Sequence, residues 1–245
     1  MENKNHYAVV LGASGEIGQE ICRSLAADGW SLYIHFNMGE AEANELRSEL
    51  SIGYPLLEFK TIQGDFSIES GAQDLAKKIQ KVSAIVVANG QSMYKLLTET
   101  TSDDMDALWR VHMQNPAQFI GLLSSKLRSV DKSYVVFIGS IWGNTGAAGE
   151  VMYSAVKGAQ HAFVKAYAKE GAYAGIRVNA VAPGWIETGM NDAIPEDERQ
   201  MVINEIPLMT VGTPKNVADA VEFLLSGKAD YMTGEILKVN GGWHI

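Results

Sequence analysis

The sequence contains one cysteine, no long apolar run and no excess of positive charge. The single Cys22 excludes an intrachain disulfide and a thiolate metal cluster. No apolar run approaches the ~18 residues that cross a bilayer, and residues 1–5 lack the apolar stretch of a signal peptide. The net charge of −9 argues against binding to nucleic acid or to an anionic membrane. We therefore expect a cytoplasmic protein with neither nucleic-acid nor membrane partners.

What is present indicates one α/β domain spanning residues 1–245. Short apolar runs alternate with helical patterns, which is typical of a parallel sheet covered by helices on both faces. The expected strands are Tyr7–Leu11, Ser31–Phe36, Leu56–Ile62, Ala84–Val87, Tyr134–Ile138, Ile176–Val181 and Ile236–Val239. The expected helices after the first are Glu40–Leu50, Ser67–Ile79, Ser102–Arg128 with an interruption at Pro116, Glu150 to about Tyr173, Glu196–Glu205 and Pro214–Ser226. This order predicts a doubly wound Rossmann fold with a parallel sheet of about seven strands.

A glycine-rich turn joins the first expected strand to the first expected helix. Gly12, Gly15 and Gly18 let the backbone approach a pyrophosphate, which the free N–H groups and the dipole of a helix N-terminus attract. A plain tight turn between strand and helix is the alternative interpretation of the same residues.

Three residues in the middle of the chain have the chemistry of a proton-transfer site. Ser140 follows a strand, and Tyr153 and Lys157 are spaced by four residues, so they project from one face of a helix. A lysine ammonium favours the phenolate and is expected to lower the pKa of the tyrosine. The serine hydroxyl would hold a substrate oxygen while the tyrosine gives or takes a proton. By itself the Tyr–Lys pair also fits a packed tyrosine beside a solvated lysine.

Together these motifs resemble the short-chain dehydrogenase/reductase family. The resemblance is carried by the glycine turn, Ser140, Tyr153, Lys157, the run from Asn179 to Gly184, and Thr188. It implies a Rossmann fold, a nicotinamide cofactor and a homotetramer or homodimer. It also implies that Tyr153 donates a proton to a substrate carbonyl, Ser140 fixes the carbonyl oxygen, and Lys157 holds the nicotinamide ribose.

The resemblance also implies a set of dinucleotide contacts at the carboxyl ends of the strands. Asp65 would contact the adenine, Asn89 and Gly90 would border the adenosine ribose, and residues 183–188 would border the nicotinamide amide and the phosphates. The full set is Gly12, Ser14, Gly15, Glu16, Ile17, Gly18, Asn37, Asp65, Phe66, Ala88, Asn89, Gly90, Tyr153, Lys157, Pro183, Gly184, Ile186 and Thr188.

Two positions depart from the family pattern. Glu16 stands where compact members usually have the middle glycine, which brings a carboxylate near the diphosphate. His112 stands where the family has a catalytic asparagine that acts largely through its backbone carbonyl. A histidine supplies the same carbonyl, and we favour this interpretation over a titratable side chain in the proton relay.

The end of the second expected strand, His35-Phe36-Asn37, bears on coenzyme choice. NAD-preferring sites place an acidic residue there to accept a hydrogen bond from the ribose 2′-hydroxyl. No acid is present, and a 2′-phosphate would meet Ser14, Asn37 and a protonated His35, although no arginine stands nearby. The sequence therefore predicts NADPH over NADH.

Within the family, the runs around Ser140 and Tyr153, with His112 and residues 239–244, resemble the bacillar reductases that act on elongation factor P. The implied substrate is a 5-aminopentanone group on a lysine of that factor. A carboxylate would suit its free amine. Glu150, three residues before Tyr153, is one candidate, but an acid there also suits a helix N-terminus, and both interpretations stay open. Glu187 is a second candidate.

Aromatic residues and competing functions complete the sequence-based expectations. Trp142 and Trp185 are expected to form apolar walls of the cleft, with ordinary core packing as the alternative. A 3-oxoacyl-carrier-protein reductase or a general small-ketone reductase is the alternative function. A dinucleotide sensor without activity is disfavoured by intact Ser140, Tyr153 and Lys157. Histidine, aspartate and glutamate do not occur with metal-ligand spacing, so no metal is expected.

Overall fold

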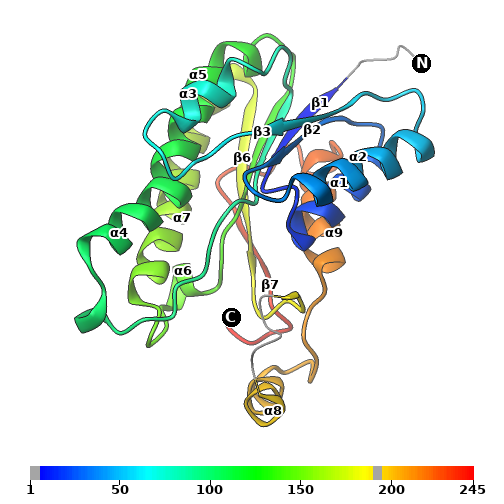
Figure 1. Ribbon diagram of the computed structural model, residues 1–245. Coiled ribbons are helices and arrows are strands. Elements are labelled where there is room, and N and C mark those ends of the chain that lie inside the picture. The colour runs from blue at the N-terminus through cyan, green and yellow to red at the C-terminus, as the bar shows by residue number, and fades with distance from the viewer. Residues whose placement is uncertain (1–5, 190–194) are drawn as a thin grey trace.

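One parallel sheet of seven strands forms the centre of the molecule (Figure 1). The computed structural model describes residues 6–189 and 195–245. The strand order is β3-β2-β1-β4-β5-β6-β7, and each neighbouring pair is parallel. The strands are β1 (Tyr7–Leu11), β2 (Ser31–Phe36), β3 (Phe59–Gln63), β4 (Ala84–Val87), β5 (Ser133–Ile138), β6 (Ile176–Pro183) and β7 (Ile236–Val239). The predicted doubly wound α/β fold is confirmed.

Helices cover both faces of this sheet. Successive residues of each strand point to opposite faces, so each face carries apolar side chains that a layer of helices buries. Ala8 and Val10 of β1 belong to one apolar cluster, and Val9 and Leu11 belong to the other. The first cluster packs under α1 (Glu16–Ala27), α2 (Glu40–Gly53) and α9 (Pro214–Leu225). The second packs under α3 (Gly71–Ala76), α5 (Asn115–Leu127) and α7 (Val151–Gly171). Cys22 lies in the first cluster with no exposed surface.

The strand order reverses between β1 and β4. Strand β1 pairs with β2 on one side and with β4 on the other, so the chain winds outward in both directions from this point. The carboxyl ends of β1 and β4 therefore leave a crevice between their loops, where α/β proteins of this topology bind ligands. Gly12 and Ala88 are the first residues past these two strands.

Several element boundaries differ from the expectations, most of them by one to three residues. Strand β3 begins at Phe59 and not at Leu56, because residues 55–57 form a turn in which the Leu57 N–H bonds the Tyr54 carbonyl at 3.0 Å. Helix α3 is shorter than the predicted helix, starting at Gly71, where a Cβ would lie 2.0 Å from the Asp65 carbonyl oxygen. A one-turn helix, α6 (Trp142–Thr145), follows β5 and is not among the helices expected from the sequence.

The predicted interruption at Pro116 takes a different form. Helix α4 (Ser102–Trp109) continues into a π-helical turn over Arg110–Gln114 and then into α5. Pro116 lies in the first turn of α5, where its missing N–H costs nothing. The wider π-helical turn before Pro116 accommodates the change, and π turns of this kind are frequent at functional sites.

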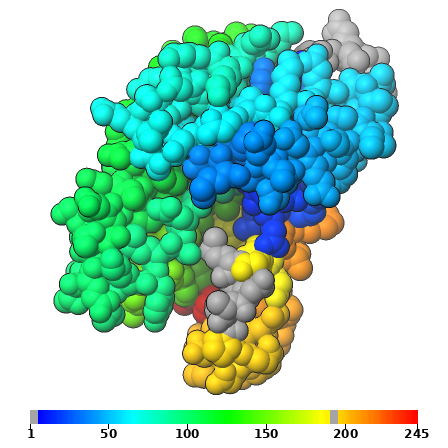
Figure 2. Space-filling model, in the orientation of Figure 1, coloured from blue at the N-terminus to red at the C-terminus, as the bar shows by residue number. Residues whose placement is uncertain are grey.

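Helix α8 (Glu196–Glu205) has no buried residue and projects from the main body at the end where β7 finishes (Figures 1 and 2).

Within residues 6–189 and 195–245, every helix is too short or too polar to cross a membrane. The same residues contain no group of three or more His, Cys, Asp or Glu side chains that could hold a metal ion.

Candidate active site

Ser140, Tyr153 and Lys157 lie together just past the carboxyl end of β5. A side-chain hydrogen bond joins Tyr153 and Ser140. The Lys157 ammonium lies 5.5 Å from the centre of the Tyr153 ring and donates a hydrogen bond of 2.9 Å to the carbonyl of Ile138, the last residue of β5. Helix α7 thus presents both side chains to the strand end, as their four-residue spacing predicts.

The pKa values in this trio differ from the expectation that Lys157 lowers the pKa of Tyr153. Burial and the negative charge of Glu150 raise the Tyr153 pKa to about 12, while the hydrogen bond from Ser140 lowers it. Burial lowers the Lys157 pKa to about 7. Loss of hydration outweighs the attraction between ammonium and phenolate here, so the phenol stays protonated at neutral pH. A protonated phenol is a proton donor.

His112 lies in the π-helical turn and reaches the trio from the side. Its ring meets the Tyr153 ring edge to face, with 5.8 Å between ring centres. Its Nε2 lies 3.1 Å from the backbone N–H of Gln91 and 3.0 Å from the Gln91 carbonyl. Its backbone carbonyl accepts a hydrogen bond of 2.7 Å from Gln160 of α7. The side chain is buried and its pKa is lowered to about 3 by burial and by Lys157, so the ring is neutral.

The glycine turn is shaped by close backbone contacts. A Cβ on Gly12 would lie 2.6 Å from the Asn89 Cα, and one on Gly18 would lie 2.2 Å from the Gly12 carbonyl oxygen. A Cβ on Gly15 would make only an ordinary contact of 3.6 Å with the Gly12 carbonyl oxygen, so close packing does not require a glycine there. Gly15 caps α1 without a side-chain hydrogen bond, which leaves the helix N–H groups to an external anion. The residues present therefore fit a dinucleotide diphosphate.

His35 corrects one sequence-based expectation. It is 3% exposed, its Nδ1 accepts a hydrogen bond of 3.0 Å from the Gly12 N–H, and its Nε2 lies 3.1 Å from the Gly64 carbonyl. Burial lowers its pKa to about 4. A neutral ring with both nitrogens engaged is not a phosphate ligand. Its place is beneath the glycine turn, where it holds the Gly12 backbone.

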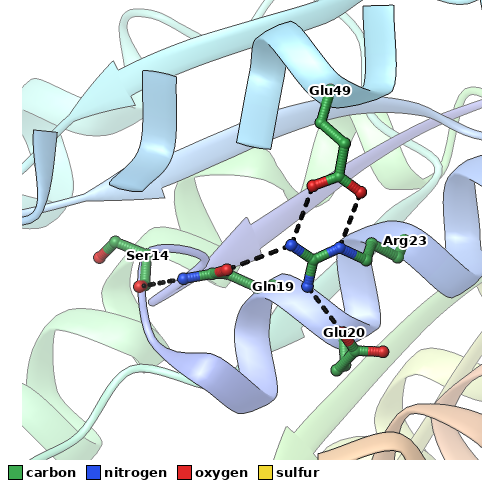
Figure 3. Close-up of polar contacts among 5 residues, drawn as sticks. All are labelled: Ser14, Gln19, Glu20, Arg23 and Glu49. Carbon is green, nitrogen blue, oxygen red and sulfur yellow. Dashed lines mark hydrogen bonds and ion pairs between the residues drawn. The ribbon is translucent and has the colours of Figure 1, made fainter. Parts of the chain in front are cut away.

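Arg23, which the sequence analysis did not single out, supports the glycine turn through Gln19 (Figure 3). Gln19 donates a hydrogen bond of 3.0 Å to the Ser14 carbonyl, and Arg23 donates one of 3.4 Å to Gln19. The Arg23 guanidinium also bonds Glu20 at 2.6 Å and Glu49 of α2 at 2.8 and 2.9 Å. Two carboxylates thus neutralise Arg23, and it ties the turn to α2.

Glu16 joins two segments that are far apart in the sequence. Its carboxylate accepts a hydrogen bond of 2.6 Å from the Gly189 N–H. Gly189 follows Thr188 in the segment after β6, which borders the predicted diphosphate position. The carboxylate that the sequence places near the diphosphate therefore has a backbone partner in the described structure.

The other predicted dinucleotide residues also lie at this edge of the sheet. The Asn89 amide donates a hydrogen bond of 2.9 Å to the Val111 carbonyl, but its buried Oδ1 has no partner among the described residues. Asn37 is exposed and bonds Asp65 at 3.4 Å. Ile17 lies in the first turn of α1, and Pro183 is the last residue of β6. The remaining predicted residues follow β1, β3, β4 or β6 and are Ser14, Phe66, Ala88, Gly90, Gly184, Ile186 and Thr188. An orphaned buried acceptor beside Gly12 supports a ligand at this point.

The predicted substrate residues are partly brought together. Trp142 and Glu150 are joined by a side-chain hydrogen bond, and burial raises the Glu150 pKa. Glu150 is the residue that caps α7, so it lies one position before the helix that was predicted to begin with it. Trp185 is half-buried after β6, and no ring contact links it to this group. Glu187 forms an ion pair with Arg199 of α8, so the negative charge of Glu187 is already paired with a positive one.

Two neighbours of the site were not found from the sequence. Gln160 lies two turns after Tyr153 on α7, a spacing that could have placed it on the same face. Tyr94 lies over Gly149, where a Cβ would be 2.8 Å from its ring, and the Lys95 N–H bonds the Gly149 carbonyl at 2.6 Å. No periodic signal marks Tyr94, because it lies in an irregular segment.

Known proteins share this fold and part of this sequence. A family model described as Enoyl-(Acyl carrier protein) reductase matches residues 12–244. The oxidoreductase YmfI of Bacillus subtilis (strain 168) is 42% identical over 242 residues, covering 98% of this chain and 99% of that protein. The 3-oxoacyl-[acyl-carrier-protein] reductase FabG of Salmonella typhimurium is 31% identical over 245 residues, covering 100% of both. A crystal structure of a blue fluorescent protein from a metagenomic library, in complex with NADPH, has a TM-score of 0.92 and 28% identity, with 100% of both chains covered. This chain belongs to the short-chain dehydrogenase/reductase family of NAD(P)-dependent oxidoreductases.

Proposed function

We propose that this protein reduces a ketone to an alcohol with NADPH as the cofactor. The observation that carries the proposal is the hydrogen bond between Tyr153 and Ser140 beside the buried Lys157. These groups lie at the same edge of the sheet as a glycine turn that fits a dinucleotide diphosphate.

The proposed chemistry is the addition of one hydride and one proton across a carbonyl group. A bound nicotinamide dinucleotide supplies the hydride. Ser140 donates a hydrogen bond to the ketone oxygen and Tyr153 gives its proton to that oxygen as negative charge develops there. The raised Tyr153 pKa suits this direction, because the phenol holds its proton at neutral pH. Lys157 holds the nicotinamide ribose, and His112 acts through its backbone carbonyl.

The residue that follows β2 is the reason for proposing NADPH over NADH. Asn37 follows this strand in place of the acid that accepts a hydrogen bond from a ribose 2′-hydroxyl. Ser14 and Asn37 are the proposed contacts of the 2′-phosphate, without His35. The solved relative with 28% identity that was crystallised with NADPH supports the same coenzyme.

The proposed substrate is the 5-aminopentanone group on a lysine of elongation factor P. Glu150 supports it, because its carboxylate lies beside Trp142 in a partly dry position that would suit an ammonium group. A 3-oxoacyl-carrier-protein is the alternative, supported by the 31% identity to FabG over the whole chain. The assembly we propose is a homodimer or homotetramer.

Tyr153→Phe tests the reaction. We expect the variant to lose about 10²–10⁴-fold in the rate of ketone reduction while its dinucleotide affinity stays within about twofold, because only the proton donor is removed. The measurement is NADPH oxidation by absorbance, with NADPH binding followed by fluorescence. Reduction at the wild-type rate would reject Tyr153 as the donor.

Intact-mass analysis tests the substrate. Elongation factor P bearing the ketone, incubated with enzyme and NADPH, should gain two hydrogens, and the Tyr153→Phe enzyme should add none. No gain on that protein, with turnover of acetoacetyl thioesters, would favour the carrier-protein alternative.

A further inference from the structure

We infer that Trp243 and His244 form, with Trp142, an aromatic wall that selects substrates by the part of the molecule remote from the carbonyl. The inference rests on the proposed ketone reduction and adds specificity-determining residues to it. The three residues are called the aromatic wall below.

The aromatic wall is built by ring contacts between two distant parts of the chain. The Trp142 ring lies 5.2 Å from the Trp243 ring and 5.4 Å from the His244 ring, at interplanar angles of 68° and 62°. Trp243 and His244 stack on each other at 5.3 Å and 27°. Edge-to-face and offset contacts at these distances are favourable geometries for aromatic rings. All three side chains keep part of their surface exposed, so the wall has an accessible side.

Hydrogen bonds hold the segment after β7 in place. The Asn240 amide donates 2.7 Å to the His244 carbonyl, and its Oδ1 accepts 3.0 Å from the Gly242 N–H. The Trp243 indole N–H donates 3.1 Å to Glu205 of α8. A Cβ on Gly184 would lie 2.9 Å from the Asn240 Cβ, so this segment closes against the loop that follows β6.

Trp142 connects this segment to the reacting groups. Its backbone N–H lies 3.2 Å from the Ser140 Oγ, and its side chain bonds Glu150, one turn before Tyr153. The aromatic wall therefore begins two residues from the proposed carbonyl-binding serine. Its Trp243 and His244 end lies on the side of Trp142 that faces α8.

This arrangement separates two tasks. Ser140 and Tyr153 act on the carbonyl and do not depend on what the ketone carries further away. A longer substrate that extends past Ser140 meets Trp142, whose orientation is set by Trp243 and His244. An apolar contact of this kind discriminates between substrates by about 10–200-fold.

The test compares two ketones with variants on and off the aromatic wall. We expect Trp243→Ala to lower the ratio of kcat/KM for 2-decanone to kcat/KM for 2-butanone about tenfold, mainly through KM of the longer ketone. Tyr231→Ala, which removes an aromatic ring that is fully exposed, should leave this ratio unchanged. An unchanged ratio in Trp243→Ala, or an equal loss for both ketones, would overturn the inference.

A second measurement separates this inference from the proposed function. In ¹⁵N-tryptophan NMR spectra, the Trp142 indole signal, assigned with Trp142→Phe, should shift in Trp243→Ala and on addition of 2-decanone. These shifts do not require turnover, so the aromatic wall can be tested even in an enzyme that reduces neither ketone. A Trp142 signal that ignores both changes would refute the wall.

Discussion

At the scale of single residues, burial changes the pKa values of three side chains at the site. Burial lowers the pKa of Lys157 to about 7 and that of His35 to about 4, and it raises the pKa of Tyr153 to about 12. Each change favours the neutral form of the group. Each pKa change makes the stability of the folded state depend on pH between the folded and the unfolded pKa values, and that dependence can be measured.

Lys157→Met is expected to abolish most activity and yet to stabilise the protein most at low pH. Below pH 7 both the folded and the unfolded states carry the ammonium, so the folded state bears the full cost of burying it. Between pH 7 and 10.5 the unfolded state binds more protons, so the stability of the wild type rises with pH. The gain from the substitution should therefore shrink from pH 6.5 to pH 9.5 in urea denaturation. Lys165→Met, an exposed lysine of the same helix, is the control, and a pH-independent gain would contradict the assignment.

His35→Leu is expected to weaken dinucleotide binding and to cost about 1–3 kcal/mol of stability, because the Gly12 N–H loses its acceptor. His35→Asn, which keeps an acceptor, should be milder. Since the folded pKa is about 4 and the unfolded value 6.5, wild-type stability should fall as the pH drops from 6.5 to 4. Denaturation curves at pH 7 and pH 4.5 test both points. Equal effects of Leu and Asn would contradict the proposed role.

At the scale of elements, α1 is held from two sides. Gln19 and Arg23 tie it to the glycine turn and to α2, and Glu16 ties its first turn to the segment after β6. This second tie keeps Thr188, the neighbour of Gly189, next to the glycine turn. A carboxylate at the N-terminus of a helix is also favoured by the helix dipole.

Glu16→Ala is therefore expected to weaken NADPH binding about tenfold or more, because a hydrogen bond to a charged group contributes about 1.5–3 kcal/mol. Glu16→Gln keeps an acceptor oxygen for the Gly189 N–H and should bind NADPH more tightly than the alanine variant. Fluorescence titration gives the dissociation constants. An alanine variant that binds NADPH as tightly as the wild type would show that the hydrogen bond between Gly189 and Glu16 does not position the segment after β6.

At the scale of the whole molecule, the crevice between the ends of β1 and β4 joins the two halves of the sheet. A ligand that spans it stabilises both halves at once, because anything that binds only the folded state raises its stability. The glycine turn and Asn37 come from one half, and Asn89, Ser140 and Tyr153 come from the other.

Thermal melting with matched ligands tests the coenzyme preference. At a hundred times its dissociation constant, 2′-phospho-ADP-ribose should stabilise the protein by about 2.7 kcal/mol, which is about 5–10 °C in Tm for a chain of this size. ADP-ribose at the same concentration should give a smaller shift, because it lacks the 2′-phosphate. A larger shift with ADP-ribose would overturn the preference for NADPH.

The sequence by itself determined the fold class, the strand positions and the residues of the trio. Alternating apolar runs and helical patterns are local signals, and so is the four-residue spacing of Tyr153 and Lys157. It failed where local signals are weak, as at the short turn before β3 and the π-helical turn before Pro116.

Only the tertiary structure decided what surrounds these residues. It buried His35 beneath Gly12, joined Glu16 to Gly189 across 173 positions of sequence, and packed Trp243 and His244 edge to face against Trp142. Contacts between distant segments and the loss of hydration on burial depend on the packing of the whole chain. No periodicity or spacing along the sequence encodes either of them in a form that can be read locally.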